Sequence, residues 1–191
     1  MKCGKPVEAE EIEYCRDCSR HALAYTQGRS VWLHTEPASS AIYRLKYHNR
    51  RIYAVTFAAE MADRYGSQLR KWEVGEILPI PLHQSKRRRR GFNQAEILAR
   101  ELGKKTGIPL NTCALVRVKK TKPQKRLDDY GRAENLKNAF GVSKEWIPKK
   151  NVLLVDDIYT TGNTIHNAAK VLKKAGAENV YFLTISIGQG L

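Results

Sequence analysis

The stretch VLLVDDIYTTGNTIHNAAKVL, residues 152–172, decides the fold of this chain. It begins with a continuous apolar run, which is typical of a strand buried on both faces of a parallel sheet. Two carboxylates, Asp156 and Asp157, end that run, and a turn leads into a predicted helix that begins at Thr164 and ends just before Gly176. Residues 178–188 repeat the buried-strand pattern. Strand, helix and strand in close succession predict a βαβ unit and therefore an α/β protein with a parallel sheet.

The rest of the chain supplies further strands and helices. Apolar residues at helical spacing indicate the helices, and glycines and prolines mark limits between elements. In chain order we predict a strand passing into helix or loop over 30–50, a helix at 52–69, a short strand near 76–80 followed by a basic loop, a helix from about Phe92 to Lys105, a strand at 111–119, and a long loop or exposed helical excursion at 119–140.

Length and composition indicate one soluble globular domain with a small appendage. The chain has 191 residues, of which 42% are hydrophobic, and this content is too high for a disordered protein. No apolar run reaches the roughly 18 to 20 residues that a membrane span requires. The first residues contain no apolar segment typical of a signal peptide. We therefore expect a cytoplasmic protein without a membrane span.

The charge is strongly positive. Lys and Arg total 34 against 19 Asp and Glu, which gives a formal net charge of +15. A surface of this kind attracts polyanions such as nucleic acid, anionic lipid or a phosphorylated small molecule. The densest run is KRRRR at 86–90, which is either a solvated charge run or a contact to nucleic-acid phosphates.

The turn after the two carboxylates forms a candidate phosphate site. Ligands of α/β proteins bind at the carboxyl ends of strands, and the N-terminus of the following helix offers unpaired N–H groups and a partial positive charge. A glycine permits the tight turn and close approach of the backbone, and the threonines add hydroxyl donors. The residues of this turn are Thr160, Thr161, Gly162, Asn163 and Thr164.

The carboxylates of Asp156 and Asp157 suit a different part of the same ligand. They can accept hydrogen bonds from the vicinal hydroxyls of a ribose, or lie in the outer shell of a Mg²⁺ ion that the ligand holds. Together with the turn they predict a site for a ribose 5-phosphate group. The alternative is a strand ending in solvated acids, with Asn163 or Thr164 capping the helix.

The positions of the cysteines indicate a separate N-terminal segment. Cys3, Cys15 and Cys18 fall in a polar N-terminal segment without an apolar core of its own. We predict a small Cys-rich lobe at 1–21 and a main domain at 22–191. In a cytosolic chain, such clustered cysteines favour a metal site over disulfides.

The residues quoted above resemble a known family. VLLVDDIYTTGNT resembles the PRPP-binding motif of type I phosphoribosyltransferases, and the chain resembles one branch of them, the competence-related ComF family. PIPLHQSKRRRRGFNQAEILA, TKPQKRLDDYGRAENLKNAF and CGKP…YCRDC resemble further segments of that branch, in the same order. The resemblance implies a type I phosphoribosyltransferase fold, a parallel-rich sheet flanked by helices, with an N-terminal zinc-ribbon-like lobe.

The resemblance also implies roles for individual residues. Asp156 and Asp157 would contact the ribose hydroxyls, and residues 160–164 would hold the 5′-phosphate of PRPP with Mg²⁺ present. The remaining implied residues belong to a pyrophosphate loop and a flexible hood at 119–132, and they are Arg90, Gly91, Gln124, Lys125 and Arg132.

The zinc ligands depart from the pattern of the family, which has four cysteines. Cys3-Gly4 matches the second cysteine, and Cys15 and Cys18 match the second pair. A structural Zn²⁺ takes four ligands. Either the natural chain starts upstream, or His21 supplies the fourth ligand, or the lobe is vestigial and has free thiols. Cys113, inside the predicted strand at 111–119, is expected to be a small buried hydrophobe.

Two functions follow. The first is an enzyme, a glycosyltransferase of the pentosyltransferase type, that transfers phosphoribosyl from PRPP to an unidentified acceptor and releases pyrophosphate. The alternative is a non-catalytic PRPP or nucleotide sensor whose basic surface handles single-stranded DNA with competence-machinery partners. Stacking of bases on Phe92 or Tyr130 would assist the alternative, although packing roles are favoured for both.

Overall fold

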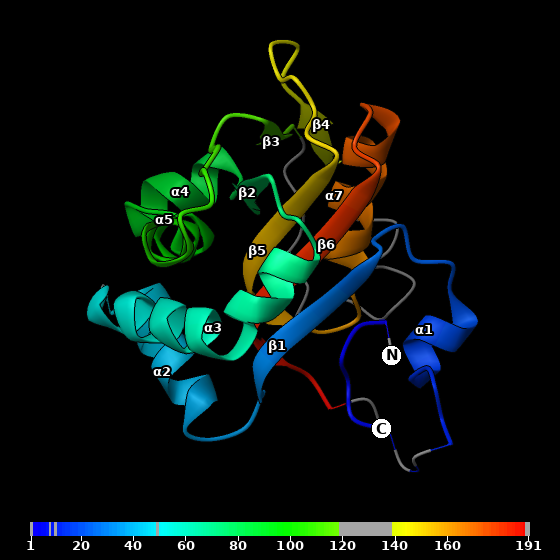
Figure 1. Cartoon of the computed structure of the whole chain (residues 1–191). Coiled ribbons are helices and arrows are strands. Elements are labelled where there is room, and N and C mark those ends of the chain that lie inside the picture. Colours follow the sequence, from blue (N-terminus) through cyan, green and yellow to red (C-terminus); the bar gives the residue numbers. More distant parts are fainter. Residues whose placement is uncertain (1, 8, 10, 49, 119–138, 190–191) are drawn as a thin grey trace.

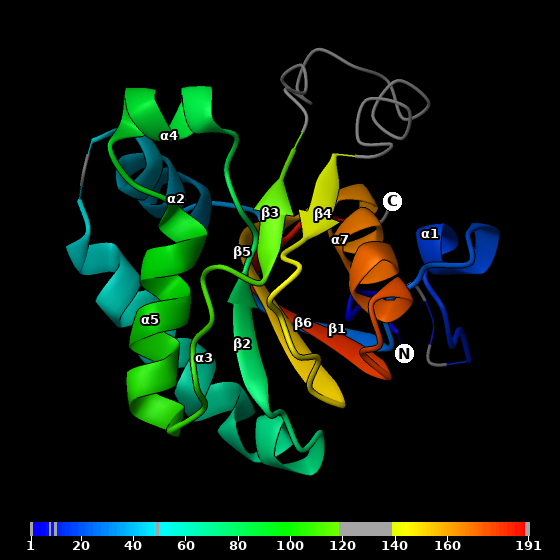
Figure 2. The ribbon, with the colours of Figure 1, turned by 90° about the horizontal axis from the view of Figure 1, so that it is seen from above.

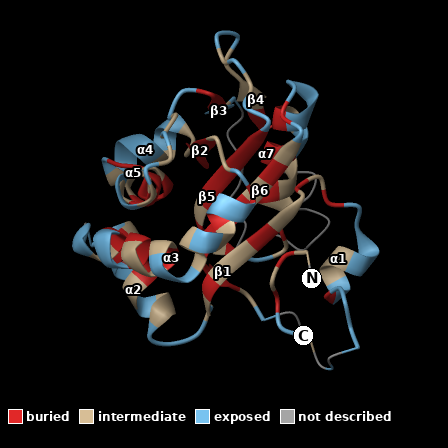
Figure 3. Cartoon of the chain, in the orientation of Figure 1, coloured by how far each residue is buried: buried red, intermediate tan, exposed pale blue. Residues whose placement is uncertain are grey.

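The structure is a computed structural model that describes residues 2–7, 9, 11–48, 50–118 and 139–189. Its centre is a four-stranded sheet in the order β1-β6-β5-β2, in which all neighbouring strands are parallel (Figure 1). The long central strands are buried along most of their length (Figure 3), as expected for a sheet covered on both faces. The four strands are β1 (Gln27–Leu33), β2 (Glu76–Pro79), β5 (Asn151–Tyr159) and β6 (Asn179–Ile187).

Helices cover the two faces of the sheet and create two hydrophobic cores (Figures 1 and 2). Val152 and Leu154 of β5 belong to one core, and Leu153 and Val155 belong to the other, because successive side chains of a strand point to opposite faces. One face carries α7 (Asn163–Lys174) and, farther out, α1 (Arg16–Arg20) of the N-terminal segment; the other carries α2 (Ala38–Tyr47), α3 (Ile52–Lys71) and α5 (Gln94–Thr106).

Two smaller elements complete the fold. β3 (Leu115–Arg117) and β4 (Phe140–Val142) form an antiparallel pair that lies between α4 (Gln84–Arg90) and α7 in Figure 2. The predicted hood at 119–132 lies between β3 and β4 in the sequence and falls outside the described residues.

The predicted α/β architecture is confirmed, and so are the main strands and helices. The basic run was wrongly predicted as a loop, because residues 86–90 lie in the helix α4. The His83 side chain accepts a hydrogen bond from the backbone N–H of Ser85 and caps this helix, and Gly91 ends it in the left-handed conformation. Arg and Lys are also good helix formers.

The expected burial of Cys113 is wrong as well. Cys113 is exposed, and β3 begins only at Leu115. The Asn111 side chain accepts hydrogen bonds from the backbone N–H groups of Cys113 and Ala114, at 3.0 Å each. This turn holds the residues before Leu115 out of the strand.

The N-terminal lobe packs on the main body. Cys3, Cys15 and Leu23 belong to the same hydrophobic core as Phe182 of β6. The predicted boundary at residue 21 therefore separates segments that share one core. Within the described part of the chain, no helix is both long and apolar enough to cross a membrane.

Candidate functional site

The two carboxylates lie near the carboxyl end of β5. Asp157 is 5% exposed, and Asp156 is half-buried. Asp156 Oδ1 accepts a hydrogen bond of 2.9 Å from the backbone N–H of Asp157. Burial raises the pKa of Asp156, and the negative charge of Asp157 raises it further. The acid pair is thus a place where negative charge is concentrated and partly desolvated.

The turn that follows leads directly into α7. Gly162 caps this helix with φ +78°, and the N–H of His166 donates to the Gly162 carbonyl at 2.8 Å. A Cβ on Gly162 would overlap the hydroxyl of Tyr159 and would lie 2.8 Å from its Cζ. Only glycine fits here, and the first N–H groups of α7 face the turn. The other residues of the turn are exposed or half-buried, and they are Thr160, Thr161, Asn163 and Thr164.

Lys46 brings a positive charge to the acid pair from the last turn of α2. Its Nζ lies 2.7 Å from Asp157 Oδ2, and the two side chains are 17% and 7% exposed. The helix is held in the core by Ile42 and Leu45, which are almost fully buried. Sequence reasoning did not assign Lys46 to the site, because α2 and β5 are far apart in the chain.

Further cations converge on the same region. Burial lowers the pKa of Lys86, and the charges of Arg117 and Arg90 lower it further. Burial likewise lowers the pKa of Arg117, and the charge of Asp156 opposes that lowering. Arg117 therefore lies near Asp156, and Lys86 lies near Arg117 and Lys46. Sequence reasoning selected neither residue. Helical periodicity could have singled out Lys86 from the sequence. Lys86 and Arg90 are four residues apart, on one side of α4, and both are half-buried, while the arginines at 87–89 are exposed.

Arg90 and Gly91 lie at the end of α4. Arg90 donates to Gln94 Oε1 at 3.0 Å and to the Tyr47 hydroxyl at 3.2 Å, and its guanidinium lies 5.0 Å from the centre of the Tyr47 ring. These contacts join α4 to α2 and α5. The other predicted residues of the pyrophosphate loop and hood, Gln124, Lys125 and Arg132, lie outside the described residues.

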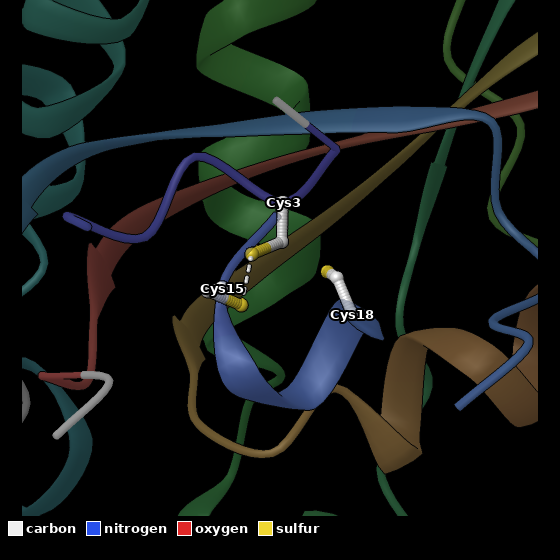
Figure 4. Close-up of side chains that lie close together, drawn as sticks. All are labelled: Cys3, Cys15 and Cys18. Carbon is white, nitrogen blue, oxygen red and sulfur yellow. Dashed lines mark hydrogen bonds between the residues drawn. The ribbon is translucent and has the colours of Figure 1, made fainter. Parts of the chain in front are cut away.

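The three N-terminal cysteines meet. Their Sγ atoms lie within 4.8 Å of one another, and the thiols point toward each other (Figure 4). A hydrogen bond shared with Cys3 lowers the pKa of Cys18 to about 6, against the effect of burial, and raises that of Cys3. Thiolate sulfurs this close fit three positions of a tetrahedral zinc site. His21 is exposed and is not part of this cluster.

Buried tyrosines connect the cysteine cluster to the turn before α7. The hydroxyl of Tyr25 lies 3.7 Å from Cys18 Sγ and 2.6 Å from the hydroxyl of Tyr159. A second connection is the backbone N–H of Ala24, which donates to His166 Nδ1 at 3.0 Å. The lobe therefore contacts, through Cys18 and Tyr25, the same turn that is predicted to hold a phosphate.

An exposed aromatic and basic surface lies on α2 and the start of α3. Tyr43 and Tyr47 are 53% and 52% exposed, and their ring centres are 4.8 Å apart. Beside them is a hollow of about 370 Å³. Its lining residues are Arg44, His48, Arg50, Ile52 and Tyr53. Through the Tyr47 contact with Arg90, this surface continues onto the exposed arginines of α4.

Comparison with known proteins identifies a domain and a set of relatives. The sequence profile of the phosphoribosyl transferase domain matches residues 88–186. Competence protein F of Haemophilus influenzae is 34% identical over 93% of this chain and 80% of its own length. Competence protein ComFC of Bacillus subtilis is 29% identical over 96% of this chain and 75% of its own. DNA utilization protein YhgH of Salmonella typhimurium is 29% identical over 94% and 79%.

Among solved structures, a purine phosphoribosyltransferase from Pyrococcus horikoshii Ot3 aligns with a TM-score of 0.42 and 15% sequence identity. The alignment covers 69% of this chain and 73% of that one.

Proposed function

This chain belongs to the ComF family and carries a phosphoribosyl transferase domain, and on that premise we propose that it binds PRPP and transfers its phosphoribosyl group to an acceptor with release of pyrophosphate. One observation carries the proposal. The acid pair, half-buried Asp156 and buried Asp157, and the Gly162 turn before α7 are separated by only a few residues, so a single ligand could contact both.

The two parts of the site suit the two ends of a phosphorylated ribose. Asp157 and Asp156 accept hydrogen bonds from vicinal hydroxyls, while the N–H groups at the start of α7 and the threonine hydroxyls of the turn bind the 5′-phosphate. The glycine at position 162 lets the phosphate approach the backbone.

The cations around the acid pair suit the leaving group. As the bond from ribose to pyrophosphate breaks, negative charge grows on the pyrophosphate and positive charge grows on the ribose ring. Lys86 and Arg117 would stabilise the first, and the negative charge that the acid pair carries would stabilise the second. Mg²⁺, a cation that prefers oxygen ligands, would neutralise the pyrophosphate when bound with it.

The test is calorimetric titration of PRPP into the wild-type protein, with and without Mg²⁺, and into an Asp156→Asn, Asp157→Asn double variant. We expect binding to the wild type that Mg²⁺ strengthens, and a loss of at least about 100-fold in the variant, because both carboxyl groups that accept the ribose hydroxyls and the negative charge they carry are removed. A wild type that does not bind PRPP would refute the proposal.

We also propose that the lobe holds a structural Zn²⁺ through Cys3, Cys15 and Cys18. The close thiols, one of which has a lowered pKa, support this assignment. The same free cysteines support a cytoplasmic location, since thiols persist in reducing compartments.

A second candidate function, the handling of single-stranded DNA, is favoured by the surface around Tyr43 and Tyr47. Proteins that bind single strands combine basic grooves with aromatic rings on which bases stack. Exposed tyrosines next to the arginines of α4 provide both. The name of the YhgH relative, DNA utilization protein, supports this candidate.

We expect a fluorescent single-stranded oligonucleotide to bind the wild-type protein with an affinity that falls steeply as salt is added. A Tyr43→Ala, Tyr47→Ala double variant should bind about tenfold or more weakly, because each stacked base contributes about 1–3 kcal/mol. Tyr14→Ala, at an exposed tyrosine of the lobe, is the matched control. Equal affinity for the oligonucleotide in the Tyr43, Tyr47 variant and in Tyr14→Ala would contradict this assignment. The Asp156→Asn, Asp157→Asn variant should still bind the oligonucleotide.

A further inference from the structure

The ion pair between Lys46 and Asp157 calls for a functional explanation. It joins α2 to β5 at 2.7 Å, and both partners are largely buried. Burying two charges costs desolvation that their mutual attraction often fails to offset, so such a pair is weak evidence for a role in stability alone. Apolar side chains of similar volume would fill this position at least as well.

A rigid helix holds the ammonium group of Lys46 next to the acid pair. Ile42 and Leu45 anchor α2 in the core, so the ammonium group is delivered by a rigid element and not by a mobile loop. The neighbouring cations come from other elements, Lys86 from α4 and Arg117 from β3. Among the described residues, Lys46 is the cation with a direct ion pair to either acid.

The two acids interact with each other. They are adjacent in the chain, and the backbone N–H of Asp157 donates to Asp156 Oδ1. Two carboxylates this close repel when both are ionised, so one of them tends to keep its proton. Burial and Asp157 raise the pKa of Asp156, and the charge of Lys46 opposes this rise.

We infer that Lys46 is the positioning residue of the ribose site: its ammonium group holds the Asp157 carboxyl in one orientation and keeps the acid pair able to accept hydrogen bonds from two ribose hydroxyls. This inference rests on the proposed function and adds a residue to it. Lys46 acts through Asp157, and its role concerns the hydroxyls of the ligand and not the phosphate, which lies at the start of α7.

The experiment compares wild type with Lys46→Met, which is unbranched and one atom shorter but removes the charge, and with Lys46→Arg, which keeps the charge. Ribose 5-phosphate and inorganic phosphate are titrated into each. We expect Lys46→Met to weaken the binding of ribose 5-phosphate about tenfold or more and the binding of inorganic phosphate less than twofold. Lys46→Arg should recover part of the lost affinity for ribose 5-phosphate. Lys104→Met, at an exposed lysine paired with Glu101, controls for the lost charge.

The pH profile separates positioning from simple packing. The acids accept hydroxyls best when ionised, so affinity for ribose 5-phosphate is lost as pH falls through the titration of the pair. Without Lys46 the pKa of Asp156 should rise further, and this loss should begin at a higher pH. The inference would be overturned if Lys46→Met lost equal affinity for ribose 5-phosphate and inorganic phosphate, or if the pH at which half of the ribose 5-phosphate affinity is lost did not change.

A ligand-free measurement keeps this inference separate from the proposed function. Carbon-13 NMR follows the carboxyl carbons of the acid pair through a pH titration in wild type and in Lys46→Met. We expect the pair to titrate at a higher pH in the variant. If PRPP and ribose 5-phosphate fail to bind the wild type, the proposed function fails; if the two titrations coincide, the role of Lys46 fails.

Discussion

Gly162→Ala should weaken PRPP and ribose 5-phosphate binding at least about 100-fold while leaving the protein folded. The backbone at this position has φ +78°, which costs an alanine about 1 kcal/mol. The new Cβ would also overlap the Tyr159 hydroxyl. Tyr159 cannot retreat, because it stacks on Phe182 at 4.7 Å and shares a hydrogen bond with Tyr25. The turn must therefore shift, and the N–H groups that face the phosphate shift with it.

Gly107→Ala provides the matched control. Gly107 ends α5 with φ +74°, and a Cβ there would meet nothing within 4 Å. We expect both variants to lose about 1 kcal/mol of stability from backbone strain, Gly162→Ala to lose more because of its overlap with Tyr159, and only Gly162→Ala to lose affinity. Calorimetry and thermal unfolding measure the two effects. Wild-type affinity in Gly162→Ala would show that the turn does not bind the phosphate.

Those parts of the fold whose signals are local could be predicted from sequence. β5, α7 and β6 follow from an apolar run, a helical period and a second apolar run within about 40 residues. The Gly162 turn belongs to this same segment, so the candidate phosphate site was visible without a structure. Helix α4 was missed because its five basic residues carry no apolar period, although the His83 cap and Gly91 mark its ends.

The parts that depend on distant contacts could not be predicted. Lys46 and Asp157 are more than 100 residues apart in the sequence, and no local sequence pattern indicates that they form an ion pair. The same holds for the hydrogen bond between Tyr25 and Tyr159, which joins the cysteine lobe to the turn. Such contacts are set by the packing of helices and connecting segments on the sheet, and therefore by the fold as a whole.

The cysteine lobe gives the second large expected effect. We expect the reduced protein to contain about one Zn²⁺ per chain, and Cys15→Ser to lose it. The variant should be less stable by about 3 kcal/mol, or roughly 6–12 °C in Tm, because the metal site stabilises a lobe whose Cys3 and Cys15 lie in the main core. Elemental analysis and thermal unfolding test this expectation.

Loss of the metal should also weaken PRPP binding, although no cysteine is proposed to touch the ligand. Cys18 of the lobe contacts the Tyr25 hydroxyl, which shares a hydrogen bond with Tyr159 beside the turn, and the segment that follows the lobe reaches α7 through the bond from Ala24 to His166. Cys113→Ser is the control, because Cys113 is exposed and lies outside the cluster. If Cys15→Ser loses zinc and stability but binds PRPP as the wild type does, the lobe stabilises the fold without supporting the site. If wild-type protein contains no metal, the three thiols are not a zinc site.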